Sequence, residues 1–439
     1  MKLRFAPSPT GYLHVGNARP ALVNYLFARR HGGEFLLRLD DTDLERSKPE
    51  YAAAIEQDLK WLGISWSLMF KQSDRLALYE AAAERLKASG RLYPCFESED
   101  ELRAKREAKQ KRGMAPVYDR AMLKLTAEQR AAAEANGKKP YWRFLLSSRS
   151  VEWDDMVQGS RHVKLQAISD PVLIREDGSP LYTFTSVVDD LLTQITHVIR
   201  GEDHVTNTGV QIDIFEALGG NAAKMRFGHL PLLMDDDGGK LSKRIGGLSL
   251  RGLRQDGMEP VAVSSYLARL GTSDDPEPLD LDELAANFDL GHFSKSAARF
   301  DARQMLALNR RVLHSLSFEE VKSRLPAGAT EEFWNAVRGN LDLMTEARAW
   351  WDVVGGAIVV PVQEGEEEFL AAARSVLPEG EWDTTTWSAW TEAVKNATGR
   401  KGKALFHPLR VALTGEEQGP ELKLLLPLMG RERVLKRLR

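Results

Sequence analysis

Segments with strand character alternate with segments of helix character along the first ninety residues. Residues 3–6 and 34–39 are short and apolar, and residues 21–30 between them carry apolar side chains at helical spacing before Gly32 and Gly33. A strand–helix–strand order of this kind requires parallel pairing through a right-handed crossover. The sequence therefore predicts an α/β fold with a doubly wound, Rossmann-like parallel sheet.

The alternation is interrupted once and then resumes, so the sheet is predicted to be split by an insertion. Charged side chains dominate residues 97–112, whereas residues 194–200 are again rich in β-branched side chains. After residue 247 strand signals become rare, and helical spacing continues to the end of the chain. We expect a split sheet domain (1–90 and 189–250), an α+β insertion (91–188), a first helical domain (251–319) and a second helical domain (320–439).

The composition is that of an ordinary folded protein and contains no candidate membrane span. Hydrophobic residues make up 43% of the chain and charged residues 28%, and the net charge is only −3. The longest nearly uncharged apolar stretch, residues 353–362, is too short for a bilayer, which requires about 20 such residues. Arg4, Pro7 and Pro9 interrupt the place where an export signal would need continuous apolar side chains. We therefore expect a cytosolic protein.

Cys95 is the only cysteine in the sequence. A single thiol excludes an internal disulfide and any zinc site built from two or more thiolates. We expect no structural zinc, and we expect Cys95 to be an inert residue of the core.

The loop after the first strand carries residues that suit an anion or a nucleotide. Residues 7–11 (PSPTG) follow the strand directly, and residues 13–16 (LHVG) precede the long helix. In a doubly wound fold this loop lies at the carboxyl edge of the sheet, where ligands bind. The first turn of the helix offers free N–H groups, Gly16 lets a ligand approach the backbone, and His14 can donate to phosphate oxygens. A proline-braced turn with a capping histidine explains the same residues equally well.

A second loop, residues 238–247 (GGKLSKRIGG), places basic side chains between glycines. Lys240 and Lys243 are close enough in sequence to converge on one triphosphate, with Ser242 between them. A basic loop is more often solvated surface, and this alternative stays open. Neither loop contains the Gly-Lys-Ser/Thr ending of a P-loop, so a P-loop nucleotidase is disfavoured.

Together the two loops resemble the HIGH and KMSKS signatures of the class I aminoacyl-tRNA synthetases. The flanking residues are similar to the bacterial glutamyl-tRNA synthetases over nearly the whole chain. The similar segments are residues 4–16, 26–46, 189–190, 198–203, 402–406, 408–410, 412–415 and the lysine loop. Several long motifs in the same order are far more specific than either loop alone.

The resemblance implies a glutamate–tRNA ligase. Such an enzyme activates glutamate with ATP to glutamyl-adenylate, releasing pyrophosphate, and transfers glutamate to the terminal ribose of tRNA(Glu), releasing AMP. Attack of a carboxylate on the α-phosphate needs alignment and cationic groups, and ATP is expected with Mg²⁺ held largely by its own oxygens and water. No metal site built from protein side chains is expected. The residues implied in catalysis are His14, Gly16, Lys240, Ser242 and Lys243, and those implied in ATP binding are Thr10, Gly11, His14, Gly16, Asn17, Lys240 and Lys243.

The resemblance also implies a glutamate pocket built from Arg4, Ser8, Asp40, Tyr182 and Arg200. The side-chain carboxylate of the substrate requires a fixed cation, and an arginine at a strand end supplies a planar fork for it. Arg4 and Arg200 both fit that role. Asp40 departs from the family, which commonly has glutamate at this position to meet the amino group of the substrate.

The tRNA is expected to contact parts of the chain that lie far apart in the sequence. The resemblance implies that the insertion holds the acceptor end, that residues 251–319 contact the stem and that residues 320–439 bind the anticodon. Basic residues outnumber acidic ones in residues 399–439, and single-stranded bases are read by stacking backed by such charges. The residues expected to contact tRNA are Arg400, Lys401, Lys403 and Arg410. A monomer is the family expectation.

Other functions stay open at this point. A shortened paralogue that glutamylates a tRNA base lacks the anticodon domain, and a glutaminyl-tRNA synthetase ends in β-barrels, whereas residues 320–439 have helical spacing. A catalytically silent tRNA-binding paralogue is disfavoured by His14, Lys240 and Lys243 together. Charging of tRNA(Gln), either alone or in addition to tRNA(Glu), is not distinguished by the sequence.

Overall fold

The computed structural model describes residues 1–235, 248–356 and 358–438. Lys240, Ser242 and Lys243, which were expected to act on the triphosphate, lie outside the described residues. None of the described helices is both long and apolar enough to cross a bilayer.

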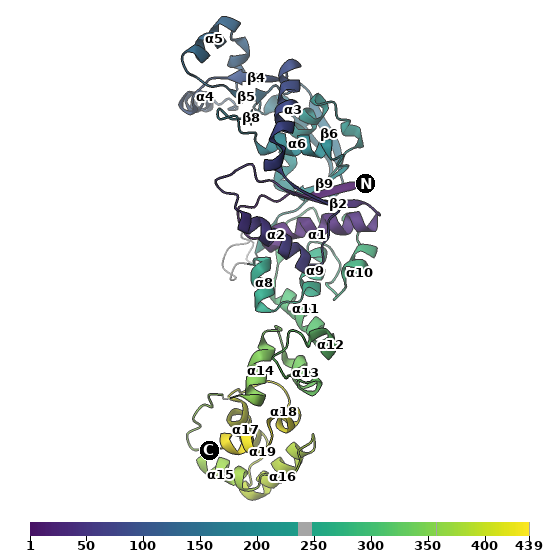
Figure 1. Cartoon of the computed structure of the whole chain (residues 1–439), viewed down its shortest axis with the longest axis vertical. Coiled ribbons are helices and arrows are strands. Elements are labelled where there is room, and N and C mark those ends of the chain that lie inside the picture. The colour runs from purple at the N-terminus through teal and green to yellow at the C-terminus, as the bar shows by residue number, and fades with distance from the viewer. Residues whose placement is uncertain (236–247, 357, 439) are drawn as a thin grey trace. The chain divides into compact units, whose positions relative to one another are not determined.

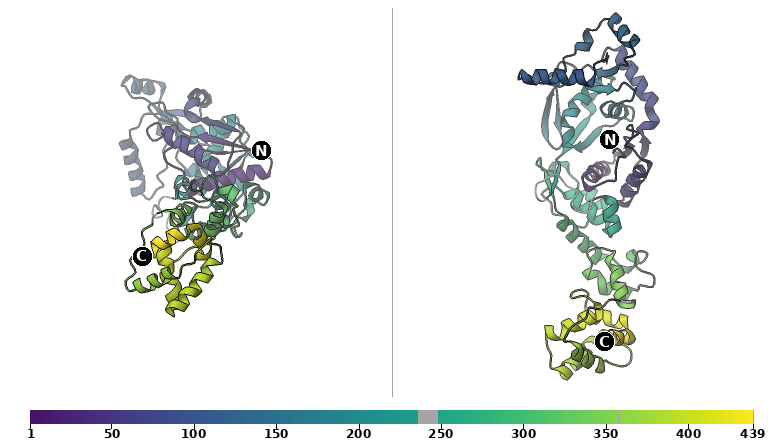
Figure 2. Two further views of the ribbon diagram at one scale, coloured as in Figure 1. Left: turned by 60° about the horizontal axis from the view of Figure 1, so that its bottom comes forward. Right: turned by 90° about the vertical axis from the view of Figure 1, so that its left-hand side faces the viewer.

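The chain divides into two compact units. Unit 1 comprises Met1–Gly252 and Ser264–Asp301, and unit 2 comprises Leu253–Val263 and Ala302–Arg439. All of the described strands lie in unit 1, and the regular elements described in unit 2 are helices (Figure 2). The predicted α/β fold with a helical C-terminal region is confirmed.

The N-terminal half of the sheet forms as the strand–helix alternation predicts. β1 (Lys2–Phe5), β2 (Glu34–Leu39) and β3 (Leu68–Lys71) pair in parallel in that order. α1 (Val15–Arg30) connects the first two strands, and α2 (Pro49–Trp61) connects the next two. α1 begins earlier than the apolar spacing predicts, because its first turn is capped by polar side chains that carry no hydrophobic signal.

The second half of the sheet combines strands from distant parts of the sequence. The order is β7 (Gly159–Lys164), β6 (Ser150–Asp155), β10 (Arg226–Leu230) and β9 (His197–Gly201). β10 is parallel to both β9 and β6, and α7 (Val205–Ala217) connects β9 to β10. β6 and β7 fall inside the range predicted for the insertion, yet they pair with this sheet. The N–H of Thr196, just before β9, donates to the carbonyl of Lys2 at 3.0 Å and brings the two halves together.

The rest of the insertion forms a small antiparallel sheet with its own helices. β4 (Leu92–Cys95), β5 (Tyr141–Phe144) and β8 (Val172–Ile174) pair in that order, beside α4 (Glu99–Lys111) and α5 (Ala127–Ala135). Cys95 is buried, as predicted for a core residue, and burial raises the pKa of its thiol to about 11. The thiol is therefore protonated at neutral pH.

Helices cover the two sides of the main sheet. α1 and α6 (Tyr182–Leu192) lie on opposite sides of it, and η1 (Gln72–Arg75) leads into α3 (Leu76–Ala88) on the side of α6 (Figure 1). Unit 1 also contains α10 (Leu281–Ala286) and a short parallel pair formed by β11 (Leu233–Asp235) and β12 (Ala298–Phe300). β12 is a strand in the region after residue 247, where the spacing of apolar residues predicts mainly helices.

The helices that follow form a separate hydrophobic core. Trp334 and Trp390 are fully buried, and their indole N–H groups donate to the carbonyls of Leu316 and Ala373 at 2.8 and 2.9 Å. Burial of a large ring is favourable here because each polar N–H keeps a partner. The helices of this core are α11 (Ala302–Ser315), α12 (Phe318–Val321), α13 (Glu331–Val337), α14 (Glu346–Gly355), α15 (Glu367–Ser375), α16 (Thr386–Thr398), α17 (Lys403–Thr414), α18 (Leu422–Met429) and α19 (Arg431–Arg437). Earlier in the chain, α8 (Leu250–Asp256) and α9 (Pro260–Arg269) each have residues in both units.

Candidate active site

His14 caps the first long helix and thereby fixes its own tautomer. Its Nδ1 accepts a hydrogen bond from the N–H of Gly16 at 3.1 Å, while Asn17 Oδ1 accepts from the N–H of His14 at 2.8 Å. Desolvation lowers the pKa of His14, so the ring is neutral at pH 7 and carries its proton on Nε2. A Cβ at position 16 would lie 2.8 Å from the ring, which explains the glycine. His14 can therefore cap the helix with Nδ1 and at the same time offer its exposed Nε2–H as a hydrogen-bond donor.

The segment that follows the lysine loop is hydrogen-bonded to the loop that carries His14. The N–H of Val15 donates to the carbonyl of Leu248 at 3.0 Å, and the N–H of Leu250 donates to the carbonyl of Leu13 at 2.8 Å. His14 itself bridges to Ser249. The segment that begins at Leu248 is thus anchored beside the loop of His14, although the two are far apart in the sequence.

The proline-rich loop is held by its carbonyl groups, which leaves its polar side chains exposed. Pro7 O accepts from the N–H of Asp40, and Pro9 O accepts from the N–H of Lys48, both at 3.0 Å. Ser8, between these anchors, and Thr10, just after them, are exposed. A Cβ at Gly11 would meet no described atom within 4 Å, so the space beside this residue is open.

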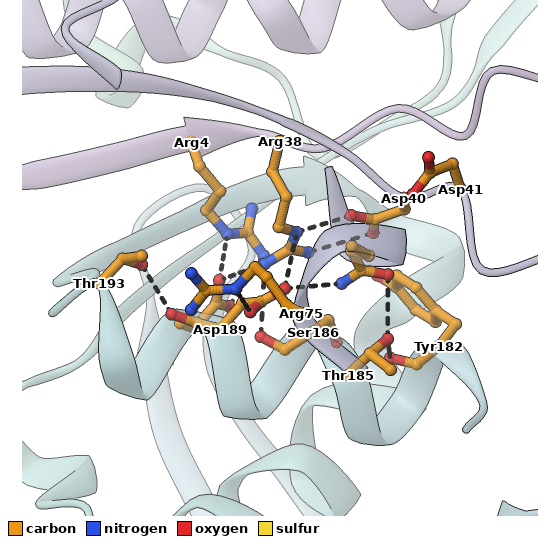
Figure 3. Close-up of polar contacts among 12 residues, drawn as sticks. Arg4, Arg38, Asp40, Asp41, Arg75, Tyr182, Thr185, Ser186, Asp189 and Thr193 are labelled. Carbon is orange, nitrogen blue, oxygen red and sulfur yellow. Dashed lines mark hydrogen bonds and ion pairs between the residues drawn. The ribbon is translucent and has the colours of Figure 1, made fainter. Parts of the chain in front are cut away.

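A cluster of buried charges joins the strand ends to α6 (Figure 3). Arg4 donates to both carboxylate oxygens of Asp190, at 3.0 and 3.2 Å. Arg38 donates to both oxygens of Asp40, at 2.6 and 3.1 Å, and also to Asp190 at 2.8 Å. Arg4 and Asp40, two of the predicted pocket residues, are therefore linked through Arg38 and Asp190, which the prediction did not include.

An ion pair between Arg75 and Asp189 extends this cluster. Arg75 Nε donates to Asp189 at 2.7 Å, and the second oxygen of Asp189 accepts from Gln72 and Tyr79, each at 2.9 Å. The formal charges of Arg4, Arg38, Arg75, Asp40, Asp189 and Asp190 cancel. The cluster is self-neutralising and fixes the strand ends against α6, because every carboxylate in it meets an arginine.

Arg200 differs from the other buried arginines because its described partners are all uncharged. Nη1 donates to Tyr182 Oη at 3.3 Å, and Nη2 donates to Thr208 Oγ1 and Gln211 Oε1, both at 2.7 Å. Nε is buried without a partner, and no described carboxylate forms an ion pair with the guanidinium. Burial lowers the pKa of Arg200, and the attraction of Asp190, which forms no ion pair with it, offsets this only in part. The site therefore holds a cation that an anionic ligand would neutralise.

The sequence carried signals for some of the site residues that the prediction missed. Arg38 interrupts an otherwise apolar strand, and Asp189 and Asp190 lie near the end of an apolar helix. A charge inside a buried element requires a partner, so these residues could have been sought together. Thr208 and Gln211 give no such signal, since neutral polar residues are common in helices.

The residues expected to contact tRNA near the C-terminus have different surroundings. Arg400 forms an ion pair with Glu366 and lies 4.4 Å from the centre of the Phe369 ring. Arg410 donates from Nη1 and Nη2 to the carbonyl of Pro420, at 3.2 Å in each case. Lys401 and Lys403, which flank the start of α17, are exposed.

Comparison with known proteins assigns the family. A family model described as tRNA synthetases class I (E and Q), catalytic domain, matches residues 1–307, which is more than half of the chain. The chain belongs to the class I tRNA synthetases. A second family model, described as an anticodon binding domain, matches residues 360–439 of the synthetase. The resemblance identified from the two loops is thus confirmed.

Relatives of the synthetase match it over almost its whole length. It is 65% identical to glutamate–tRNA ligase 2 of Gluconacetobacter diazotrophicus over 100% of this chain and 99% of the relative. It is 68% identical to glutamate–tRNA ligase 2 of Granulibacter bethesdensis over 99% of this chain and 97% of the relative. A crystal structure of a glutamate tRNA ligase from Elizabethkingia meningosepticum, in complex with its amino acid, matches with a TM-score of 0.85 and 26% identity, covering 100% of this chain and 98% of that one.

Proposed function

We propose that this synthetase is a glutamate–tRNA ligase, which activates glutamate with ATP and transfers it to tRNA(Glu). The observation that carries the proposal is the buried guanidinium of Arg200, whose described partners are neutral and whose Nε has none. A substrate with a side-chain carboxylate would neutralise this charge, whereas glutamine would not. Relatives at 65% and 68% identity carry the name of this activity. Their similarity over the whole chain favours it over a shortened paralogue.

In the proposed pocket Arg200 and Tyr182 bind the side chain of glutamate, and Arg4, Ser8 and Asp40 surround its α-carbon end. The ion pairs of Arg4 and Asp40 hold both side chains in place before substrate arrives, so little ordering remains to be done on binding. Ser8 lies on the loop whose flanking carbonyl accepts from the N–H of Asp40. Asp40 has a shorter side chain than glutamate, and both of its oxygens accept from Arg38, so it meets the substrate's ammonium group with an oxygen that Arg38 already binds.

ATP is proposed to bind at the start of α1. The N–H groups of Gly16 and Val15 in the first turn already donate to His14 Nδ1 and to the carbonyl of Leu248, so the exposed Nε2–H of His14 is the donor offered to phosphate oxygens, and the open space at Gly11 suits a nucleotide. Thr10, Gly16 and Asn17 form the rest of this surface. Lys240, Ser242 and Lys243 are proposed to act on the triphosphate as the transition state forms, and the anchoring of Leu248 beside Val15 supports their approach. Mg²⁺ accompanies ATP as part of the substrate.

The tRNA is proposed to bind the insertion with its acceptor end and the C-terminal helices with its anticodon. Lys401 and Lys403 are exposed beside Phe406, whose ring is 45% exposed and lies 6.2 Å from that of Trp387. Exposed rings next to cations suit the stacking of single-stranded bases. Arg400 and Arg410, which have internal partners, would contribute mainly through their charge. The proposed enzyme acts as a cytosolic monomer.

The decisive experiment is charging of purified tRNA(Glu) and tRNA(Gln) with labelled glutamate and with labelled glutamine. We expect ATP-dependent attachment of glutamate to tRNA(Glu), release of pyrophosphate, and no attachment of glutamine. Attachment of glutamate to tRNA(Gln) would identify the wider or redirected form of the activity. No adenylate formation with either amino acid in the presence of tRNA would instead indicate a silent tRNA-binding paralogue.

The proposed contact of Asp40 with the substrate's ammonium group predicts a pH dependence. Burial raises the pKa of Asp40 to about 6, against the opposing effect of Arg38, so its charge is present above this pH and lost below it. Between about pH 7.5 and about pH 5.5 the ionised fraction falls about fourfold, and we expect the KM for glutamate to rise by about the same factor. The measurement is the initial rate of charging against glutamate concentration at saturating ATP.

Asp40→Asn is the matched control, because it keeps the shape of the side chain and cannot ionise. Its KM for glutamate should be higher than that of the unmodified protein at pH 7.5 and nearly constant down to pH 5.5. An equally steep pH dependence in Asp40→Asn would place the titration elsewhere, for example on ATP.

A further inference from the structure

A chain of buried hydrogen bonds leads from β6 to the guanidinium of Arg200. Asp155 Oδ2 lies 2.5 Å from His229 Nδ1, His229 Nε2 lies 2.9 Å from Thr208 Oγ1, and Arg200 Nη2 donates to the same Oγ1 at 2.7 Å. His229 and Thr208 have no exposed surface. The four residues come from β6, β10, α7 and β9, so the chain crosses the sheet behind the proposed pocket.

The carboxylate of Asp155, at the end of this hydrogen-bond series that is farthest from Arg200, determines which atom carries the proton in each bond. Asp155 Oδ1 accepts from the N–H groups of Val157, Gln158 and His229, at 3.1, 2.9 and 3.0 Å. Desolvation opposes its charge, but these bonds and the one from His229 lower the pKa of Asp155 to about 2. Asp155 is therefore an acceptor at neutral pH, and His229 must donate to it from Nδ1.

The direction of the remaining bonds follows from that tautomer. When the His229 ring holds one proton, on Nδ1, its Nε2 has none and accepts the hydroxyl proton of Thr208. The oxygen of Thr208 then has only lone pairs left, and it accepts from Arg200. Without His229 the hydroxyl could rotate, since the carbonyl of His204 also lies within 3.1 Å.

Gln211 provides a second tether of the same kind. Its Nε2 donates to Ser186 Oγ at 2.9 Å, which turns its Oε1 toward Arg200. Thr208 and Gln211 together use both N–H groups of Nη2. The rotation of the guanidinium is thereby fixed, and its unpartnered Nε is held in one direction.

We propose that Asp155 and His229, acting through Thr208, are positioning residues for the selection of the substrate's carboxylate. They hold the plane of Arg200 without neutralising it, because the group that reaches the guanidinium is a hydroxyl and not a carboxylate. A carboxylate in direct contact with Arg200 would compete with the substrate's carboxylate for the guanidinium. A carboxylate that acts through His229 and Thr208 orients the guanidinium and leaves its charge available. The inference rests on the proposed function, since it assigns the orientation of the same pocket.

Thr208→Val tests the relay, because it removes the hydroxyl and keeps the branched shape. The loss of a hydrogen bond to a charged group is expected to raise the KM for glutamate about 10- to 100-fold. The kcat and the KM for ATP should stay within about threefold of the unmodified values, since the guanidinium touches only glutamate. Thr208→Ser restores the hydroxyl and should restore the KM for glutamate. Thr391→Val, which removes a buried hydroxyl from α16, should leave every parameter unchanged.

Asp155→Asn provides a second route if the valine variant does not fold. An amide at this position donates to His229 Nδ1, so the ring moves its proton to Nε2 and donates to Thr208 in competition with Arg200. The KM for glutamate should rise at least threefold with the KM for ATP unchanged. Equal increases for both substrates, or no increase in either variant, would overturn the relay.

The unmodified protein is assayed first, which separates the two possible failures. Absence of glutamate charging in the unmodified protein overturns the proposed function. Normal charging by the unmodified protein together with an unchanged KM in Thr208→Val overturns the positioning role alone.

Discussion

Arg200→Gln is expected to raise the KM for glutamate about 30- to 4,000-fold while the KM for ATP changes by less than about twofold. The factor corresponds to the loss of about 2 to 5 kcal/mol when one partner of a buried charge pair is removed. The effect is large because the substrate's carboxylate would enter a buried site that no longer holds a compensating cation. Initial rates of pyrophosphate exchange, measured with tRNA present and each substrate varied in turn, check the prediction.

The change should not unfold the protein, because Arg200 has no described carboxylate partner that would be left buried without its counter-charge. Arg226→Gln is a suitable control, since Arg226 is an exposed arginine at the start of β10 whose side chain donates to backbone carbonyls. It should behave as the unmodified protein in both assays. Parallel losses for glutamate and ATP in Arg200→Gln would indicate a structural role for this arginine.

Asp190→Asn is expected to lower the free energy of unfolding by about 3 to 5 kcal/mol, the cost of breaking a buried ion pair from one side. Asp190 accepts from both Arg4 and Arg38, so its neutralisation leaves two buried guanidinium groups undercompensated. Desolvation opposes the charge, but the two arginines outweigh it and lower the pKa of Asp190. The stabilisation is therefore present at neutral pH and is lost only as acid protonates the carboxylate.

Urea unfolding followed by circular dichroism measures this change, with Asp352→Asn as the control. Asp352 pairs with Arg348 on the surface of α14 with 48% of its side chain exposed, and its loss should cost less than about 0.5 kcal/mol. A similar small cost for both variants would mean that the buried cluster contributes as little as a surface pair.

The sequence by itself was enough to determine the class of the fold and the place of the loop that we propose binds ATP. Strand and helix signals near β1, α1 and β2 depend on the spacing of neighbouring apolar side chains, and that spacing is local information. The same holds for the loop that ends at His14, since a strand followed by a helix places it at the carboxyl edge of the sheet. The two signature loops, occurring in the order typical of the family, then identified the family from the sequence alone.

Only the tertiary structure decided which charges meet and which one is left without a counter-charge. Arg4 and Arg200 have the same chemistry and similar positions on strands, so the sequence predicted one role for both. The fold places Asp190 of α6 against Arg4, while Thr208 and Gln211 of α7 reach Arg200 with neutral oxygens. Coulombic energy depends on distance and burial and not on separation along the chain. For that reason the difference between an arginine that meets a carboxylate and one whose described partners are neutral appears only when the helices pack on the sheet.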